Sequence, residues 1–87
     1  MTWRRHEVVF TPEAERDLER LDRILGGRIK RTIERYAETG HGDVRRLQGV
    51  DRRWRLRVGD WRVIFTLDDG RLLVLVLRVL PRGGAYR

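Results

Sequence analysis

The side chains of this sequence that could do chemistry are mainly arginines, and several of them occupy alternate positions of two neighbouring segments. The segment Trp54–Val58 alternates strictly between apolar and basic residues, with Arg55 and Arg57 as the basic ones, and Arg62 follows in the next segment. A guanidinium group can donate two parallel hydrogen bonds to one phosphate. The chemistry that these residues favour is therefore the binding of a phosphate and the stabilisation of its negative charge.

The spacing between the two segments sets how their side chains face one another. Gly59 and Asp60 form a two-residue hairpin loop with glycine first, as a type II′ turn prefers. The expected cross-strand partners are Val58 with Trp61, Arg57 with Arg62, Leu56 with Val63, and Trp54 with Phe65. One face of this hairpin is apolar and must meet the helices, so Arg55, Arg57 and Arg62 are predicted to project from the opposite face.

Two interpretations of this basic face remain open from the residues alone. Like charges directly across a strand pair destabilise a sheet by roughly 0.2 to 1 kcal/mol, which suggests that an anionic ligand occupies the space between Arg57 and Arg62. The alternative is a solvated polar face, whose arginines splay apart or pair with acids such as Asp68, because alternation is what any half-exposed strand shows.

The carboxyl end of the chain adds three further candidates. Segment 81–87 leaves the last predicted strand and ends at once, so it brings Arg82, Tyr86 and Arg87 near that strand's exit. The pKa of a tyrosine is ordinarily near 10, but nearby guanidinium groups favour the phenolate and lower it. The alternative is that Tyr86 covers an edge of the core, and its spacing alone favours this structural role.

The elements that must position these residues begin with a strand at Glu7–Phe10 and two helices. Thr11 and Pro12 are a hydroxyl N-cap followed by proline at the first helical position. An apolar stripe at helical spacing then consists of Ala14, Leu18, Leu21 and Leu25. Gly26-Gly27 is expected to end this helix, and a second helix is expected from Arg28 to Glu38, with Gly40 terminating it. The two helices predict an αα-hairpin.

The remainder of the chain is predicted to be sheet. Short strands are expected at Val44–Leu47, at Trp54–Val58 and at Trp61–Leu67, with a turn over residues 48–51. Asp69-Gly70 suits a type I′ turn, and the nearly all-apolar Arg71–Leu80 is typical of a central strand that is covered on both sides. We therefore predict one α+β domain over residues 1–87: an N-terminal strand, the αα-hairpin, and a mainly antiparallel twisted sheet packed on the helices.

Composition excludes several classes of protein. The chain has no cysteine and a formal charge of +7, which attracts phosphates or an acidic partner. The chain has nineteen arginines and one lysine, a bias that a GC-rich genome also produces, so the positions of the arginines carry more weight than their number.

The longest apolar run, Leu72–Leu77, is far shorter than the ~20 residues of a membrane span, and no signal peptide is visible. A cytoplasmic protein without disulfides, metal or cofactor is expected.

Other ionisable residues are assigned structural roles. His6 and His41 are far apart in sequence and lie in no ligand motif, so each is expected to be an isolated surface histidine. The acids gather in the first predicted helix, where they are expected to form a solvated face. A metal-dependent nuclease needs grouped carboxylates, and the sequence shows no such group.

The sequence resembles the RelE/ParE superfamily of toxins from bacterial toxin–antitoxin modules over nearly its whole length, and it is closer to RelE. The matching stretches are 9–14, 46–49, 54–65 and 74–79, together with Arg82 and Tyr86-Arg87. Of these, the most specific is the stretch 54–65, which contains Arg55, Arg57 and Arg62. The resemblance implies a microbial ribonuclease fold, RelE-like, and a metal-independent endonuclease that cuts mRNA in the ribosomal A site.

The resemblance also implies roles for individual residues. Arg62 would stabilise the phosphate in the transition state, Arg82 would assist the leaving group, and Tyr86 would activate the ribose 2′-hydroxyl. RNA-binding roles are expected for Arg55, Arg57, Arg46 and Arg87. An arginine, with its pKa above 12, is a poor proton donor, so Arg82 is better regarded as an electrostatic stabiliser.

The tail departs from the usual family pattern, and the alternatives follow from that. Leu80-Pro81 and Gly83-Gly84 stand where glycine, histidine and charged residues are usual. A ParE-like toxin that inhibits DNA gyrase without cleaving RNA is one alternative, and an inactive antitoxin-binding domain is another. The partners implied are a cognate antitoxin, in a hetero-oligomer with the toxin, and mRNA with the ribosome; no membrane partner is expected.

Overall fold

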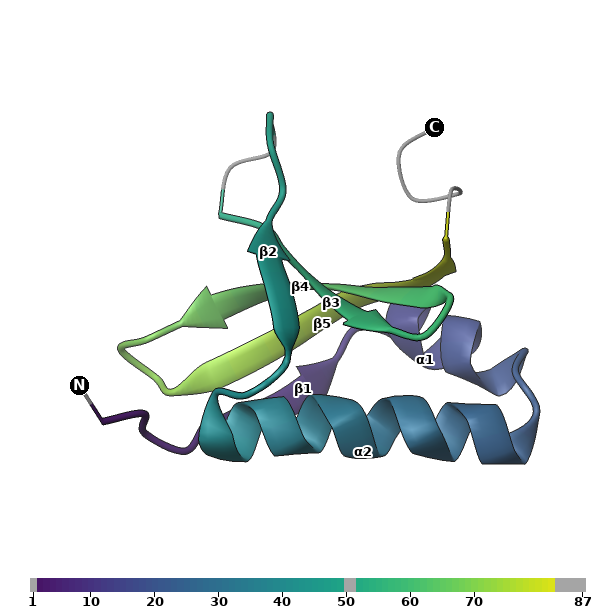
Figure 1. The fold of residues 1–87 in the computed structure, drawn as a ribbon, viewed down its shortest axis with the longest axis horizontal. Coiled ribbons are helices and arrows are strands. Elements are labelled where there is room, and N and C mark those ends of the chain that lie inside the picture. Colours follow the sequence, from purple (N-terminus) through teal and green to yellow (C-terminus); the bar gives the residue numbers. More distant parts are fainter. Residues whose placement is uncertain (1, 50–51, 83–87) are drawn as a thin grey trace.

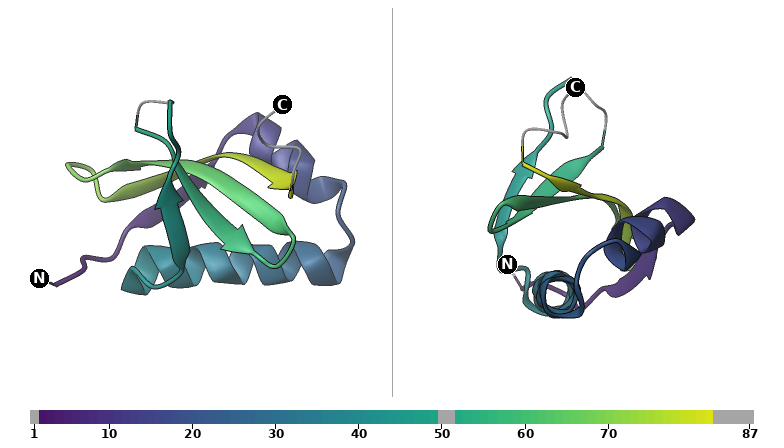
Figure 2. Two further views of the ribbon diagram at one scale, coloured as in Figure 1. Left: turned by 45° about the horizontal axis from the view of Figure 1, so that its top comes forward. Right: turned by 90° about the vertical axis from the view of Figure 1, so that its right-hand side faces the viewer.

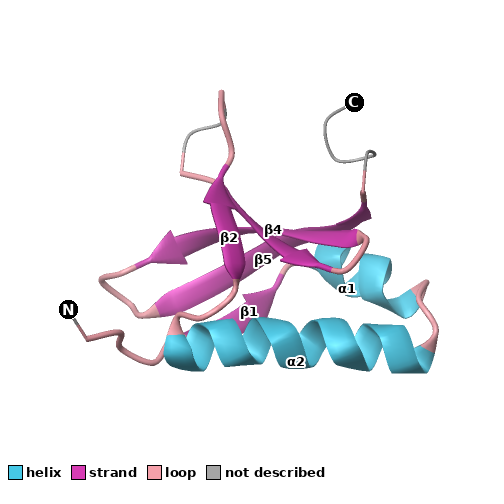
Figure 3. Ribbon diagram, viewed as in Figure 1, coloured by secondary structure: helices cyan, strands magenta, loops and turns pink. Residues whose placement is uncertain are grey.

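The protein folds as five strands and two helices, which a computed structural model describes over residues 2–49 and 52–82 (Figure 1). In chain order the elements are β1 (Glu7–Phe10), α1 (Pro12–Glu19), α2 (Arg23–Thr39), β2 (Asp43–Arg46), β3 (Trp54–Val58), β4 (Trp61–Asp68) and β5 (Leu73–Pro81). Figure 3 shows the same order coloured by type of element. The predicted α+β class, with an N-terminal strand, two helices and then a sheet, is confirmed.

The five strands form one sheet in the order β1-β5-β4-β3-β2. β1 pairs with β5 in parallel, and the other three pairs are antiparallel. Figure 2 shows that the sheet is strongly curved and that both helices lie on its concave side. The convex side of β2, β3 and β4 has no helix over it.

The core lies between the concave side of the sheet and the two helices. Its buried members are Ala14 and Leu18 of α1, Ile29, Ile33, Tyr36 and Ala37 of α2, and Leu56, Val58, Val63, Phe65, Val74, Val76 and Val79 of the sheet. Apolar side chains at alternate strand positions and at three- to four-residue helical spacing therefore meet in one layer.

The start of α1 is confirmed, but its end differs from the prediction. Thr11 caps the helix, because its Oγ1 accepts a hydrogen bond from the Ala14 N–H at 3.1 Å. The break between the helices falls before Asp22, whose Oδ1 accepts from the Leu25 N–H at 2.9 Å. Gly26-Gly27 therefore lies inside α2, where the prediction placed a helix end. A carboxylate cap starts α2 upstream of the glycines, and packing outweighs their low helix propensity.

Two turns after β2 show how local sequence sets register. Gly59 adopts φ 59°, the positive value that a type II′ turn requires at its first central residue. The predicted register of β3 and β4 is observed. The β4–β5 connection differs from the predicted two-residue turn, because Asp68 pairs with Leu73 across a four-residue loop. Asp68 Oδ1 accepts from the Arg71 N–H at 3.1 Å, a side-chain turn that the Asp-Gly pattern did not indicate.

Two strands also differ in detail from their predicted form. β2 begins and ends one residue before the predicted strand at 44–47. β5 is an interior strand, but it is covered by helices on one side only: Val74, Val76 and Val79 are buried, whereas Leu75 and Leu77 on the alternate positions are half-buried. The continuous apolar run arises because β5 supplies the core on one face and the less exposed part of the convex face on the other. No described helix is long and apolar enough to cross a membrane.

Candidate functional site

The convex face of the sheet carries the predicted arginine pair. Arg57 of β3 and Arg62 of β4 are direct cross-strand partners, as the sequence predicted. Arg57 is exposed and Arg62 half-buried. Arg57 Nε donates a hydrogen bond of 3.3 Å to the Gly59 carbonyl, which holds this side chain at the hairpin end of the sheet. Two positive charges therefore stand opposite each other on a face that no helix covers.

A second pair of arginines lies beside the first on the same face. Arg45 of β2 is the cross-strand partner of Arg55 of β3. The side chain of Arg55 is only 11% exposed, and its Nη2 lies 3.4 Å from Asp43 Oδ1. Its Nε is buried and finds no hydrogen-bond partner among the described residues. A largely buried guanidinium with one long ion pair is under-compensated, as expected for a group that binds an anionic ligand.

The neighbourhood of Arg55 also contains a hollow. A pocket of about 340 Å³ is lined by Arg45, Arg46, Leu47, Gln48 and Arg55. The base of the β2–β3 loop is closed there by a hydrogen bond of 2.9 Å from the Leu47 N–H to the Arg53 carbonyl. Three arginines and one glutamine are thus among the residues that line this pocket, and these residue types can donate hydrogen bonds to an anionic group.

The structure places Arg46 apart from the other predicted RNA-binding arginines. Its cross-strand partner is Trp54, so its position belongs to the concave face even though Arg46 borders the pocket at the end of β2. Arg45, which the sequence analysis did not select, takes the place on the convex face. The sequence indicates this, because side chains alternate between the two faces of a strand: if the apolar Val44 faces the core, Arg45 lies on the opposite face.

The last described residue, Arg82, lies at the same end of the sheet as the arginine pair. Arg62 is paired with Leu80, Trp61 with Pro81, and the Arg82 N–H donates to the Asp60 carbonyl at 2.7 Å. Arg82 therefore follows directly after β5 beside the β3–β4 turn. Two further predicted site residues, Tyr86 and Arg87, lie outside the described residues.

The other ionisable candidates differ from their predicted surroundings in two cases. Asp17 was expected on a solvated face of the first helix, but it is 9% exposed and bound to Arg78 of β5. His6 was expected at the surface, but it is 7% exposed and stacks on Trp3, with ring centroids 4.6 Å apart. Both are buried because the first helix and the N-terminal segment pack on β5 and α2. His41 is exposed, as predicted.

The charge of Asp17 is stabilised in place. Burial alone raises the pKa of its carboxyl group, but hydrogen bonds from Arg78 and from the Val79 N–H, with the charge of Arg78, outweigh that effect and lower it. The same ion pair raises the pKa of Arg78. This pair joins α1 to the edge of β5, and the two partners compensate each other's charge.

Tyr36 is separated from the arginines by the sheet. It packs in the core beside Phe65, and burial followed by the charge of Asp69 raises the pKa of its phenol. A neutral phenol on the concave side has no access to a ligand of the arginine face. Within residues 2–49 and 52–82, no group of three or more His, Asp or Glu side chains is arranged to hold a metal ion.

Comparisons with known proteins give one family and one fold. Residues 8–86 match the model of the ParE toxin of the type II toxin–antitoxin system parDE. The toxin–antitoxin complex RelBE2 of Mycobacterium tuberculosis contains a chain with 28% identity and a TM-score of 0.75, over 90% of this chain and 99% of that one. The isolated RelE toxin of E. coli has 14% identity and a TM-score of 0.75, over 93% and 88% of the two chains.

An archaeal structure extends the same likeness. The RelE–RelB complex of Pyrococcus horikoshii contains a chain with 23% identity and a TM-score of 0.75, over 92% of this chain and 98% of that one. No curated protein sequence matches. The match to the isolated E. coli toxin, at 14% identity, supports the fold alone.

Proposed function

Because this chain belongs to the family of ParE toxins, and is thus the toxin of a type II toxin–antitoxin module, we propose that it acts on RNA as a metal-independent endoribonuclease. Its partner is a cognate antitoxin, as in the toxin–antitoxin complexes that it resembles. The substrate we propose is mRNA in the ribosomal A site. The observation that carries the proposal is the pairing of Arg57 with Arg62 on the uncovered face, with Arg82 at the end of the next strand.

The proposed reaction is attack by the ribose 2′-oxygen on the adjacent phosphorus. The 2′-hydroxyl loses its proton to a base, and its oxygen forms a bond to phosphorus as the bond from phosphorus to the 5′-oxygen breaks. The leaving 5′-oxygen takes up a proton from water, so a 2′,3′-cyclic phosphate and a 5′-hydroxyl end result. In the transition state negative charge grows on the phosphate oxygens, where preorganised cations stabilise it most. We assign this role to Arg62, supported by Arg57, and the stabilisation of the leaving oxygen to Arg82.

Binding of the RNA strand is assigned to the neighbouring pair and its pocket. The under-compensated guanidinium of Arg55 and its partner Arg45 offer donors to a second phosphate along the strand. Arg46 and Arg87 remain candidates for further contacts. Tyr86 is proposed as the base, by resemblance to the RelE-like toxins, whose tyrosine occupies the corresponding position near the chain end.

The test compares Arg62→Ala with the wild-type protein after induction in bacteria. Transcripts mapped by primer extension should show cuts within codons for the wild type, and Arg62→Ala should reduce cutting about 10²- to 10³-fold because one charge-stabilising group is lost. Arg35→Ala, which removes an exposed arginine from α2, is the matched control and should cut like the wild type. Equal cutting by Arg62→Ala and the control would refute the assigned site.

A second function is favoured by one specific observation, since the family model that matches is that of ParE. ParE-like toxins inhibit DNA gyrase and leave RNA intact. Induction should then yield trapped gyrase–DNA complexes with uncut transcripts. That result would replace the ribonuclease proposal, whereas cut transcripts without trapped gyrase would support it.

A further inference from the structure

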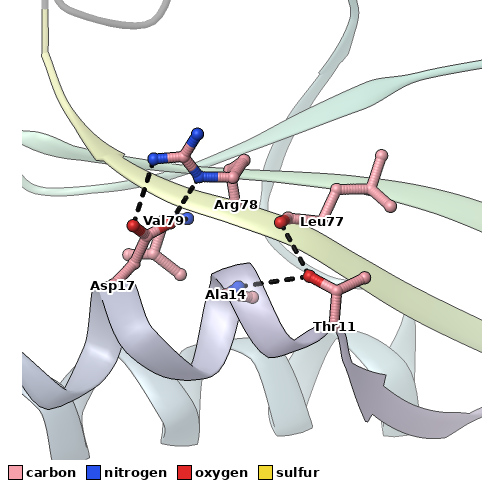
Figure 4. Close-up of polar contacts among 6 residues, drawn as sticks. All are labelled: Thr11, Ala14, Asp17, Leu77, Arg78 and Val79. Carbon is pink, nitrogen blue, oxygen red and sulfur yellow. Dashed lines mark hydrogen bonds and ion pairs between the residues drawn. The ribbon is translucent and has the colours of Figure 1, made fainter.

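The outer edge of β5 changes its partner halfway along the strand. β1 covers this edge only as far as Phe10, which pairs with Val76. Beyond that point, side chains of the α1 region take over, as Figure 4 shows. Thr11 Oγ1 donates to the Leu77 carbonyl at 2.9 Å, and Asp17 Oδ2 accepts from the Val79 N–H at 2.8 Å. The helix thus satisfies backbone groups that a neighbouring strand would otherwise satisfy.

The same part of β5 carries an irregularity in its pairing with β4. Ile64 is opposite Arg78, but Phe65 is opposite Val76, so Leu77 is one extra residue in the ladder. A bulge of this kind bends the strand and redirects the residues that follow it. The direction of the segment from Val79 to Arg82 is therefore set at the bulge.

Asp17 binds the residues that follow the extra one. Its carboxylate accepts from Arg78 Nε at 2.8 Å and from Arg78 Nη2 at 3.1 Å, in addition to the Val79 N–H. Three hydrogen bonds to one buried carboxylate leave little freedom at this point of the strand. Val79 is followed at once by Leu80, the cross-strand partner of Arg62, and Arg82 comes three residues after Val79.

We propose that Asp17 is a positioning residue, which fixes the bulged end of β5 and thereby the placement of Arg82 relative to Arg62. Asp17 lies on α1 beside the edge of β5, so its effect on the reaction passes through Arg78 and Val79, the residues that it holds. The part of this inference that concerns cleavage rests on the proposed function. The part that concerns the position of β5 does not.

The test uses Asp17→Asn in the full chain. The amide keeps the shape of the carboxylate but loses its charge, and it turns one acceptor that faces Arg78 into a donor. Ile33→Val, which removes one buried methylene from α2, is a control that weakens the core elsewhere. Glu15→Gln removes an exposed charge from the same helix as Asp17 and is the control for charge.

Amide hydrogen exchange measures how firmly the end of β5 is held, because an amide exchanges when its hydrogen bond opens. In Asp17→Asn the amides of Val79, Leu80 and Arg82 should exchange about tenfold faster, because the end of β5 opens more often once the charged acceptor is lost. The amides of β3 should keep their rates. If these three amides exchange no faster than in Ile33→Val, Asp17 has only a general structural role and the inference is overturned.

Cleavage of RNA supplies the second measurement. Asp17→Asn should lower kcat about tenfold and change KM less than about twofold, because arginines that bind the strand are untouched while Arg82 is displaced. An unchanged kcat alongside faster exchange would overturn the catalytic part. If the wild-type protein cleaves no RNA, the proposed function fails, and the exchange rates alone decide whether Asp17 positions β5.

Discussion

The two faces of the sheet use charge in opposite ways. On the side of the helices, Asp17 of α1 is buried at the edge of β5, where it accepts three hydrogen bonds from Arg78 and Val79, and a cluster of hydrophobic side chains fills the core beside it. On the convex side, Arg57 stands opposite Arg62 and Arg45 opposite Arg55. Asp17 thus has donors that compensate its charge, whereas the convex face gathers four arginines together with Asp43, which lies 3.4 Å from Arg55 and is the other cross-strand partner of Arg57. In the proposed function, the convex face is the one that binds RNA, whereas the concave face stabilises the fold.

The largest effect is expected from a change in the core of the concave face. Phe65→Ala removes a ring that is 1% exposed and packs beside Tyr36. We expect the free energy of unfolding to fall by about 4 kcal/mol, because the side chain loses its burial and leaves a cavity. Urea denaturation followed by circular dichroism measures this. A loss below about 1 kcal/mol would show that this face is not the principal source of stability.

A smaller effect, with a defined dependence on pH, is expected at Asp17. At neutral pH, Asp17→Asn should lower the free energy of unfolding by about 2 kcal/mol, since a charged hydrogen-bond acceptor is lost. The folded-state pKa of Asp17 is below its ordinary value. Its contribution is therefore complete above the unfolded-state pKa, near 4, and is lost as the pH falls through the folded-state value.

Denaturation at several pH values between 7 and 3 provides the measurement. The difference between the wild type and Asp17→Asn should narrow below about pH 4. Glu15→Gln, on the exposed side of α1, should differ little from the wild type at any of these pH values. A gap that widens in acid would contradict the assigned ion pair.

The smallest effect on stability is expected on the convex face. Arg57→Gln removes a positive charge that lies between Arg62 on one neighbouring strand and Asp43 on the other, so the lost repulsion and the lost attraction offset, and the free energy of unfolding should change by less than about 0.5 kcal/mol. Binding of an uncleavable oligoribonucleotide should weaken, and the slope of log Kd against log salt should fall by about 1, because one phosphate contact is lost.

The matched variant for this prediction is Arg28→Gln, which makes the same charge change at an exposed position of α2. It should bind the oligonucleotide almost as tightly as the wild type. If the two variants weaken binding equally, the net charge of the protein attracts the RNA, and the convex face is not a specific RNA-binding surface.

Much of this contrast could be predicted from the sequence because it depends on local rules. The strand period and the Gly59-Asp60 loop together determine that Arg57 faces Arg62, and the observed register agrees. The Thr11-Pro12 start of α1 and the Gly40 end of α2 follow from capping chemistry in the same way. These features need only a few adjacent residues.

The parts that could not be predicted depend on contacts between distant segments. The burial of Asp17 follows from α1 lying along the edge of β5, and the irregular pairing near Ile64 has no signature in the strand itself. Arg78 in an otherwise apolar strand was the one available hint. The face on which each β2 side chain lies could have been read from Val44, which would have added Arg45 to the candidates on the convex face.

The pairing of the first strand with the last has a consequence for the order of events during synthesis. β1 has no sequence-local partner and pairs with β5, and Thr11 is bonded to Leu77 across 66 residues of chain. Contacts of such long range form late, since most of the chain must be closed into a loop first. A growing polypeptide therefore lacks the completed sheet until β5 has left the ribosome, whereas the pairs β2–β3 and β3–β4, which carry Arg45, Arg55, Arg57 and Arg62, are local and can form earlier.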